Sequence, residues 1–281
     1  MNTKIKLVAV DLDGTSLNSK GLLSPRTVNT FQKLNQLGIK LVIASGRPLY
    51  QINHLVEKVG LKDENDYSIA LNGAVVGNNF NGEVLYEDHL PTNFVDKLVA
   101  DAKELGISTI IMFENQQSTF NFLQIYCQNF NDEITAHYFA NFKSKSPTEV
   151  VLVEYQGEDN LKIGKLFMAG PIAAIAAIAR VWEGRLEISH EVKTDHAIVE
   201  ITKKGTNKAW GLKQLCKLSN IKAIEVMAFG NEQNDVEMLK WAGIGIAVAN
   251  AGDHIKKHAN ITCLSNDEDG VAEALEKYFK F

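Results

Sequence analysis

The feature that most restricts the fold of this chain is a series of short, mainly apolar runs separated by segments with helical periodicity. The first two runs cover residues 5–10 and 39–44, and between them apolar side chains recur every third residue from Val28 to Leu37. A mainly apolar run of this length is typical of a strand covered on both faces, and its alternation with helices is typical of a parallel sheet. The sequence therefore predicts an α/β fold.

The pattern changes after residue 88. A hairpin signal, Asn81-Gly82, precedes the change, and the following stretch mixes helical segments (94–105, 172–182) with strand-like ones (109–113, 165–168). Regular alternation resumes after residue 190, so that "HAIVEIT" is interpreted as a strand of the resumed sheet. We expect a core formed by residues 1–88 and 191–281, with a separate α+β unit at 89–190.

Composition and net charge limit the classes of molecule that we expect this chain to bind. A formal net charge of -5 gives no electrostatic reason to expect a nucleic-acid or membrane partner, which favours small molecules. The longest mainly apolar run, 166–182, is broken by Gly170, Pro171 and Arg180, and no basic and apolar leader is recognised at the start, so a cytoplasmic protein is expected. The three cysteines are widely spaced and are interpreted as ordinary packed thiols.

Two carboxylates follow the first apolar run. Asp11 and Asp13 flank Leu12 and precede Gly14. Because side chains alternate along a strand, both carboxylates project to one side at the carboxyl end of the strand, where open α/β sheets bind ligands. At a separation of about 4 Å they repel by roughly 4 kcal/mol at an effective dielectric of about 20, so a nearby cation such as Mg²⁺ or a protonated carboxyl is expected. A solvated Asp-Gly turn is the alternative.

Polar groups also follow the next two strands. Ser45, Gly46 and Arg47 come directly after the second apolar run, where a hydroxyl and free backbone N–H groups can hold a phosphoryl oxygen. The alternative for Ser45 is a helix N-cap. Asn72 and Gly73 end the third strand in the same way, although Asn-Gly is foremost a turn signal.

The last part of the chain adds a lysine and an acidic-amide cluster. Lys208 lies near the amino end of a helix, where the helix dipole disfavours a cation, so a phosphate or the Asp pair is expected beside it. A surface helix lysine is the alternative. "GNEQND" ends another strand and presents Asn231, Glu232, Asn234 and Asp235, which could also form a capped turn.

These segments occur in the order of four family motifs. "DLDGT", "SGR", the lysine before a helix and "GNxxND" resemble the motifs of the haloacid dehalogenase superfamily of phosphohydrolases. "LNGA" and "EDGVAEAL", with the insertion between the second and third motifs, resemble its Cof-type subgroup of sugar-phosphate and small-metabolite phosphatases. The resemblance covers nearly the whole chain and implies a Rossmann-like core with an inserted α/β cap domain.

The resemblance also implies residue roles. Asp11 matches the nucleophile that becomes an aspartyl-phosphate, and Asp13 matches the general acid/base. Ser45 and Lys208 match the groups that bind the transferring oxygens, which agrees with the need for preorganised donors and positive charge in phosphoryl transfer. The remaining polar groups at the strand edges are assigned to substrate binding: Gly46, Arg47, Asn72, Gly73 and Asn234.

One position departs from the family pattern. The fourth motif usually begins Gly-Asp, and that Asp binds magnesium, whereas this chain has Asn231. The expected Mg²⁺ ligands are Asp11, the backbone carbonyl of Asp13, and Asn231 or Asp235. An amide oxygen lacks the formal charge of a carboxylate, so weaker metal binding is expected unless Asp235 compensates.

The sequence therefore favours a Mg²⁺-dependent phosphoric monoester hydrolase that acts on a small phosphorylated metabolite such as a sugar phosphate. Two alternatives stay open. One is a phosphometabolite-binding or regulatory protein with weak turnover, which Asn231 suggests. The other is a phosphotransferase or phosphomutase that uses the same intermediate. The sequence indicates neither the substrate nor the oligomeric state.

Overall fold

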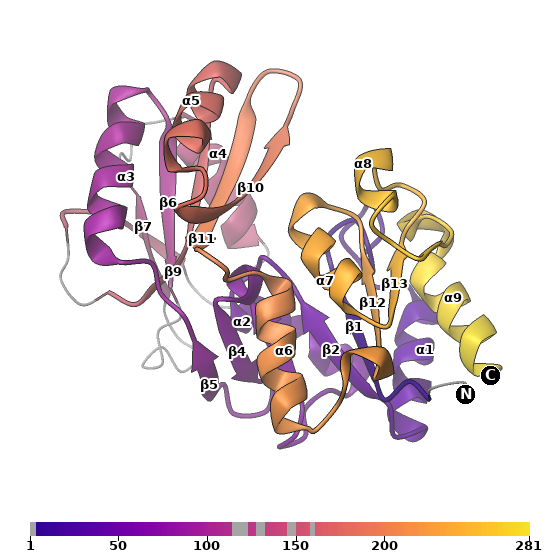
Figure 1. Cartoon of the computed structure of the whole chain (residues 1–281). Coiled ribbons are helices and arrows are strands. Elements are labelled where there is room, and N and C mark those ends of the chain that lie inside the picture. Colours follow the sequence, from indigo (N-terminus) through magenta and orange to yellow (C-terminus); the bar gives the residue numbers. More distant parts are fainter. Residues whose placement is uncertain (1–3, 114–122, 128–132, 145–149, 158–160) are drawn as a thin grey trace.

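The structure is a computed structural model that describes residues 4–113, 123–127, 133–144, 150–157 and 161–281. Its strands form two separate sheets, which build two lobes (Figure 1). The first strand and the last helix of the chain both belong to the larger lobe, the core. The smaller lobe is called the cap and comprises residues 92–203.

The core sheet has eight strands, and the first strand of the chain lies at its centre. In sheet order the strands are β14 (Ile261–Thr262), β13 (Ile244–Ala247), β12 (Val226–Gly230), β1 (Leu7–Val10), β2 (Lys40–Ala44), β3 (Tyr67–Ala70), β4 (Val75–Asn78) and β5 (Val84–Glu87). The six strands from β14 to β3 are parallel. The last two form the antiparallel hairpin that the Asn81-Gly82 signal predicts. The expected α/β core is therefore confirmed.

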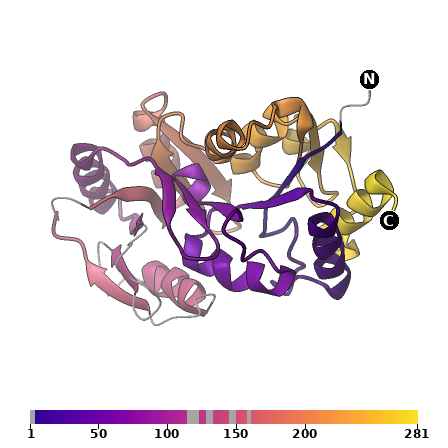
Figure 2. The same cartoon turned by 90° about the horizontal axis from the view of Figure 1, so that it is seen from below.

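The runs are mainly apolar because both faces of this sheet are covered. Val8 and Val10 belong to one hydrophobic cluster, which includes side chains of α1, α2 and α9, whereas Leu7 and Ala9 belong to another, with side chains of α6, α7 and α8. In Figure 2 the purple helices and the orange helices accordingly lie on opposite sides of the strands. The core helices are α1 (Pro25–Gln36), α2 (Leu49–Val56), α6 (Lys208–Leu218), α7 (Val236–Trp241), α8 (Asp253–Lys256) and α9 (Gly270–Phe279).

The cap sheet has six strands and is mostly antiparallel. In sheet order they are β10 (Leu186–Val192), β11 (Ala197–Lys203), β9 (Ile163–Gly170), β6 (Ser108–Phe113), β7 (Leu123–Cys127) and β8 (Val150–Glu154). Its helices are α3 (Thr92–Glu104), α4 (Glu133–Ser144) and α5 (Ile172–Trp182). Ile111 of β6 packs in the cap's own core, while Ile110 and Met112 belong to the other face. That second face is turned toward the core domain.

The return of the chain to the core differs from the sequence-based boundary at residue 190. The "HAIVEIT" segment forms β11, which pairs with β10 and β9 in the cap sheet and not with the core strands. The apolar pattern predicts a strand correctly but does not specify which sheet it joins. The core resumes after Lys203, at the turn that leads into α6.

No helix among the described residues has both the length and the apolar character needed to cross a membrane.

Candidate active site

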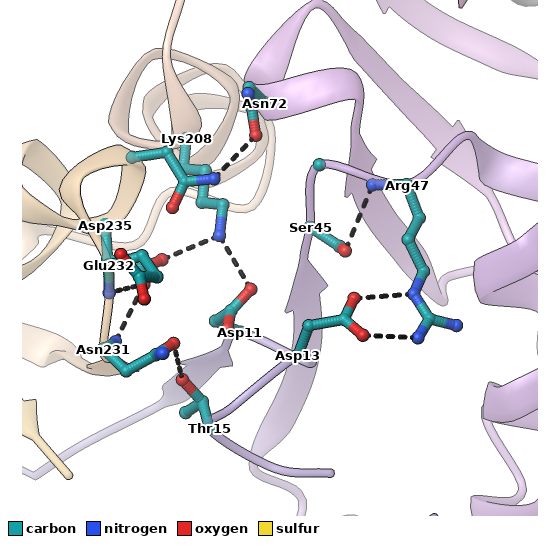
Figure 3. A network of polar contacts seen from close by, with 12 residues as sticks. Asp11, Asp13, Thr15, Ser45, Arg47, Asn72, Lys208, Asn231, Glu232 and Asp235 are labelled. Atoms are coloured by element: carbon teal, nitrogen blue, oxygen red, sulfur yellow. Dashed lines mark hydrogen bonds and ion pairs between the residues drawn. The ribbon is translucent and has the colours of Figure 1, made fainter. Parts of the chain in front are cut away.

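The polar segments meet at the carboxyl ends of neighbouring parallel strands. Asp11 and Asp13 follow β1, Ser45 follows β2, Asn72 follows β3 and Asn231 follows β12. Lys208 enters from the first turn of α6, and its side chain points toward the carboxylates (Figure 3). The structure thus brings the residues from all the sequence motifs together at one edge of the sheet, the edge where α/β sheets bind ligands.

Lys208 lies between two carboxylates. Its Nζ is 2.7 Å from Asp11 Oδ1 and 2.7 Å from Asp235 Oδ1, and its side chain is 1% exposed (Figure 3). The amino end of α6 is capped by Asn207, whose side-chain oxygen accepts a hydrogen bond from Trp210 N. A cation placed against the helix dipole is therefore held by two buried anions, and the surface-lysine alternative is wrong.

Burial is the largest single influence on the pKa values of Asp11 and Lys208. It raises the pKa of Asp11 to about 7, a shift that Lys208 opposes and that Asp235 and Asp13 increase. Burial also lowers the pKa of Lys208, but Asp11 and Asp235 outweigh it and hold that pKa above its ordinary value. A further cation beside Asp11 would favour its ionised form, in which a carboxylate can act as a nucleophile.

Asp13 faces a different partner. Arg47 donates to both of its carboxylate oxygens, from Nε at 2.8 Å and from Nη2 at 2.6 Å (Figure 3). The Asp13 side chain is 50% exposed, so it can reach a ligand in the cavity. Ser45 is buried beside this pair, and its Oγ accepts a hydrogen bond from Arg47 N at 3.2 Å.

Three oxygen atoms converge next to Asp11. The side-chain oxygen of Asn231 lies 3.2 Å from Asp11 Oδ2 and 3.1 Å from the backbone oxygen of Asp13. Thr15 Oγ1 donates to the same amide oxygen at 2.7 Å. Acceptors that face one another repel unless a cation lies among them or the Asn231 amide turns its NH₂ toward them. A carboxylate, a carbonyl and an amide oxygen are the ligands that Mg²⁺ prefers, so these residues fit a magnesium ion.

Asp235, the other expected metal ligand, is engaged elsewhere. One carboxylate oxygen accepts from Lys208, and the other accepts from the backbone N–H groups of Asn231 and Glu232 at 2.8 and 3.0 Å. Asp235 is fully buried. Its contacts orient Lys208 and the loop that carries Asn231.

The residues assigned to substrate binding occupy different places. Asn234 Nδ2 donates to Asn72 Oδ1 at 3.0 Å, and Asn234 lines the cavity above the carboxylates. Gly46 and Arg47 line the same cavity. Gly73 instead supports the site from behind: its φ is +101°, and a Cβ there would lie 2.0 Å from the backbone oxygen of Asn207, so the close approach of α6 requires glycine.

The cavity has a volume of about 580 Å³ and lies between the two lobes. The core supplies its polar end with Asp11, Asp13 and Ser45. The cap supplies an apolar wall, which consists of Ile110, Met112, Tyr138, Phe142, Phe167 and Ile198, and beside it a polar and charged part with Asn141, Lys165, Ser189, His190, Glu191, Lys193 and Glu200. A phosphoryl group at the carboxylates would therefore leave the rest of a bound molecule against cap side chains.

Four charged cap residues of the cavity were not found from the sequence: Lys165, Glu191, Lys193 and Glu200. Lys165 and Glu200 lie on the cap strands β9 and β11 and line the cavity beside Gly46. For these two the signal was present, since each is a charged residue inside an otherwise apolar strand segment, "IGKLFMAG" and "HAIVEIT". Thr15, part of the "DLDGT" segment, was likewise not assigned a role, and it holds Asn231.

Comparisons with known proteins agree with this geometry. The family model for haloacid dehalogenase-like hydrolases matches residues 8–275. The putative phosphatase YxeH of Bacillus subtilis is 29% identical over 273 residues, which cover 97% of each chain. The 5-amino-6-(5-phospho-D-ribitylamino)uracil phosphatase YitU of the same organism is 30% identical, with 99% of each chain covered. A solved structure of a haloacid dehalogenase-like hydrolase from Bacteroides thetaiotaomicron superposes with a TM-score of 0.81 at 30% identity, covering 98% of this chain and 100% of that one.

Fold, site and relatives together define a phosphatase with a Rossmann-like core and a cap. The chain belongs to the haloacid dehalogenase superfamily, in its Cof-type subgroup, and is a phosphoric monoester hydrolase that acts on small phosphorylated metabolites.

Proposed function

We propose that this phosphatase is Mg²⁺-dependent and works through a covalent aspartyl-phosphate, an acyl phosphate, on Asp11. The observation that carries the proposal is the position of the Asp11 carboxylate at the polar end of the cavity, between Lys208 Nζ at 2.7 Å and the converging oxygens of Asp13 and Asn231. Asp11, the Asp13 carbonyl and Asn231 would hold the magnesium ion. When bound, the ion offsets the charge repulsion between the phosphate and Asp11.

The side chains of the site then have separate roles in the reaction. An Asp11 carboxylate oxygen attacks phosphorus, the bond from phosphorus to the leaving-group oxygen breaks, and the Asp13 carboxyl gives its proton to that oxygen. In the second step Asp13 takes a proton from water, the water oxygen attacks phosphorus, and the bond to Asp11 breaks to release phosphate. Ser45, Arg47 and Lys208 donate to the phosphoryl oxygens, whose charge they stabilise.

The leaving group is selected by the cap. One part of its wall over the cavity is apolar, and Tyr138 is fixed in that part by a 2.5 Å contact with His196 Nε2 and by packing on Phe167, with ring centroids 4.7 Å apart. Such a wall favours a leaving group with a flat or apolar part over a fully hydroxylated sugar. The name of the relative YitU, a phosphatase for a uracil that carries a phosphorylated ribityl chain, supports this choice.

A steady-state assay tests the proposal. Purified protein with Mg²⁺ should release phosphate from a generic aryl phosphate, and a chelator should stop the release. Asp11→Asn should abolish turnover while the protein stays folded, and wild-type turnover in that variant would refute the nucleophile assignment. A panel of sugar phosphates, nucleotides, pyridoxal phosphate and flavin mononucleotide tests the leaving group, where exclusive hydrolysis of simple sugar phosphates would contradict the role given to the apolar wall.

A further inference from the structure

A buried ion pair joins two strands of the cap at the edge of the cavity. Lys165 Nζ on β9 lies 2.5 Å from Glu200 Oε1 on β11, and the lysine side chain is 2% exposed. Their neighbours on the same strands, Leu166 and Ile201, are a register pair in the apolar core of the cap. Because removing two charges from water is costly, such a pair is weak evidence of a contribution to stability, and its retention calls for another role.

Both members of the pair bind the core domain. Lys165 Nζ donates to the backbone oxygen of Gly46 at 2.6 Å, and Glu200 Oε2 accepts from Asn72 Nδ2 at 2.7 Å. Gly46 stands between Ser45 and Arg47, in the loop that faces the phosphate position. The pair therefore connects the cap directly to two of the strand-edge loops that build the active site.

A side chain at residue 46 would crowd the ends of the junction side chains. A Cβ there would lie 2.9 Å from Asn72 Oδ1, 3.3 Å from Lys165 Nζ and 3.5 Å from Glu200 Oε1. The absence of a side chain lets the charged groups of the cap reach the loop backbone. The glycine is thus explained by an interdomain contact.

The core side of the junction is held in an unusual backbone conformation. Asn72 has φ 57° and ψ 29°, and Leu71 has φ 48°. Asparagine tolerates the left-handed region, whereas leucine adopts it only at a cost that its surroundings must offset. This conformation directs the Asn72 side chain to both Glu200 and Asn234.

The charge state of Glu200 also supports a role for the ion pair in joining the cap to the core. Burial raises the pKa of Glu200, but the charge of Lys165 and the hydrogen bonds from Lys165 and Asn72 outweigh it and hold that pKa below its ordinary value. Glu200 is therefore ionised at neutral pH. Its bond from Asn72 is charge-assisted, as is the Lys165 bond to Gly46.

We propose that the Lys165–Glu200 pair is an interdomain latch that holds the cap closed over the cavity and positions the Ser45–Arg47 loop. Its action on the loop rests on the proposed function, whereas its action on closure does not. When the cap opens, the ion pair stays within the cap, and of its own hydrogen bonds those to Gly46 and Asn72 are lost. These two bonds therefore bias the equilibrium toward the closed state without trapping it there.

Lys165→Met tests the latch, because it keeps the length of the side chain and removes its charge. Hydrogen–deuterium exchange, measured without substrate, should rise in peptides that contain residues 45–48 and 71–74 and stay unchanged in the strand at 7–10. With an aryl phosphate and Mg²⁺, KM should rise about tenfold while kcat falls less than threefold, since a smaller closed fraction weakens apparent binding in proportion.

Two further variants complete the test. Lys165→Met combined with Glu200→Gln removes both charges, so it leaves no unpaired carboxylate buried and serves if the single variant folds poorly. The double variant should show the same rise in exchange and in KM. Lys97→Met removes an exposed cap lysine that pairs with Asp101 and should behave as wild type. Wild-type exchange and wild-type KM in a folded double variant would overturn the latch. If the wild-type protein releases no phosphate, the proposed function fails, and the exchange data still decide on the latch.

Discussion

Arg47 holds the carboxylate of Asp13 through two parallel hydrogen bonds, at 2.6 and 2.8 Å. The same arginine follows Ser45 in the loop that faces the phosphate position. Because a guanidinium binds a phosphate with the same two-pronged geometry, the arriving phosphate competes with Asp13 for Arg47. In the proposed mechanism, the contact would therefore hold Asp13, the proposed proton donor, aside until a substrate takes over Arg47.

Replacing Arg47 with lysine should reveal this geometry. Arg47→Lys keeps the positive charge but cannot donate two parallel hydrogen bonds to one partner. We expect kcat/KM for an aryl phosphate to fall about 10- to 100-fold, which is the equivalent of one or two charge-assisted hydrogen bonds. Arg26→Lys is the matched control, since Arg26 binds both oxygens of Glu276 on the surface of the core. Equal effects of the two substitutions would argue against a role for Arg47 at the phosphate.

Asp13→Asn should separate the two chemical steps. Without a proton donor, alkyl phosphates should lose first-step rate by about 100-fold or more, while an aryl phosphate with a better leaving group should lose less. The second step needs a base for both substrates, so a phosphorylated enzyme should accumulate. Mass spectrometry of the quenched aryl phosphate reaction measures it. A variant that slows both substrates equally and accumulates no phosphoenzyme would contradict the acid/base role.

Lys208 has a structural role as well as a chemical one. Lys208→Met leaves Asp11 and Asp235 buried without their shared cation, and we expect the free energy of unfolding to fall by about 3–5 kcal/mol. Denaturant unfolding measures this change. Lys240→Met, which removes an exposed lysine paired with Glu237, should change the same quantity by less than about 1 kcal/mol. Equal losses of unfolding free energy in the two variants would contradict the structural role of Lys208.

The raised pKa of Asp11, about 7, predicts a pH-dependent stability. Between the ordinary pKa near 3.8 and the folded value near 7, the folded protein keeps a proton on Asp11 that the unfolded chain has lost. Stability must therefore decrease as pH rises through this window. In a chelator, Asp11→Asn should gain stability relative to wild type between about pH 4 and pH 7. A constant difference across these pH values would contradict the assigned shift.

The two possible orientations of the Asn231 amide predict a relation between metal binding and the stability of the fold. Its amide can turn its NH₂ toward Asp11 Oδ2 and the Asp13 oxygen when no ion is bound, whereas a carboxylate cannot. Asn231→Asp should therefore bind Mg²⁺ about tenfold more tightly in a calorimetric titration and should unfold at a lower temperature in a chelator. Asn260→Asp controls for the added charge, since the Asn260 side-chain oxygen only accepts a bond from Gly245. Unchanged Mg²⁺ affinity in Asn231→Asp would remove residue 231 from the metal site.

The core and its strand-edge residues were predictable because local pattern determines them. An apolar run identifies a buried strand, and the polar residues that follow it must lie at one edge when the strands are parallel, as Asp11, Ser45 and Asn72 do. Pairing between distant strands was not predictable in this way. The pattern of the segment at 196–202 fits either sheet, and the contact of Lys165 with Gly46 depends on how the two lobes dock.

The central position of β1 has a consequence for the order of events during synthesis. Asp11 is supplied by the first strand, but this strand is flanked by β2 on one side and by β12, from the last quarter of the chain, on the other. The two flanks can meet only after the ribosome has produced the cap that separates them, and contacts at such sequence distance form late. A nascent chain released after the cap would carry Asp11, the proposed nucleophile, on an exposed strand edge, so the site is complete only when the final β-α units pair with this strand.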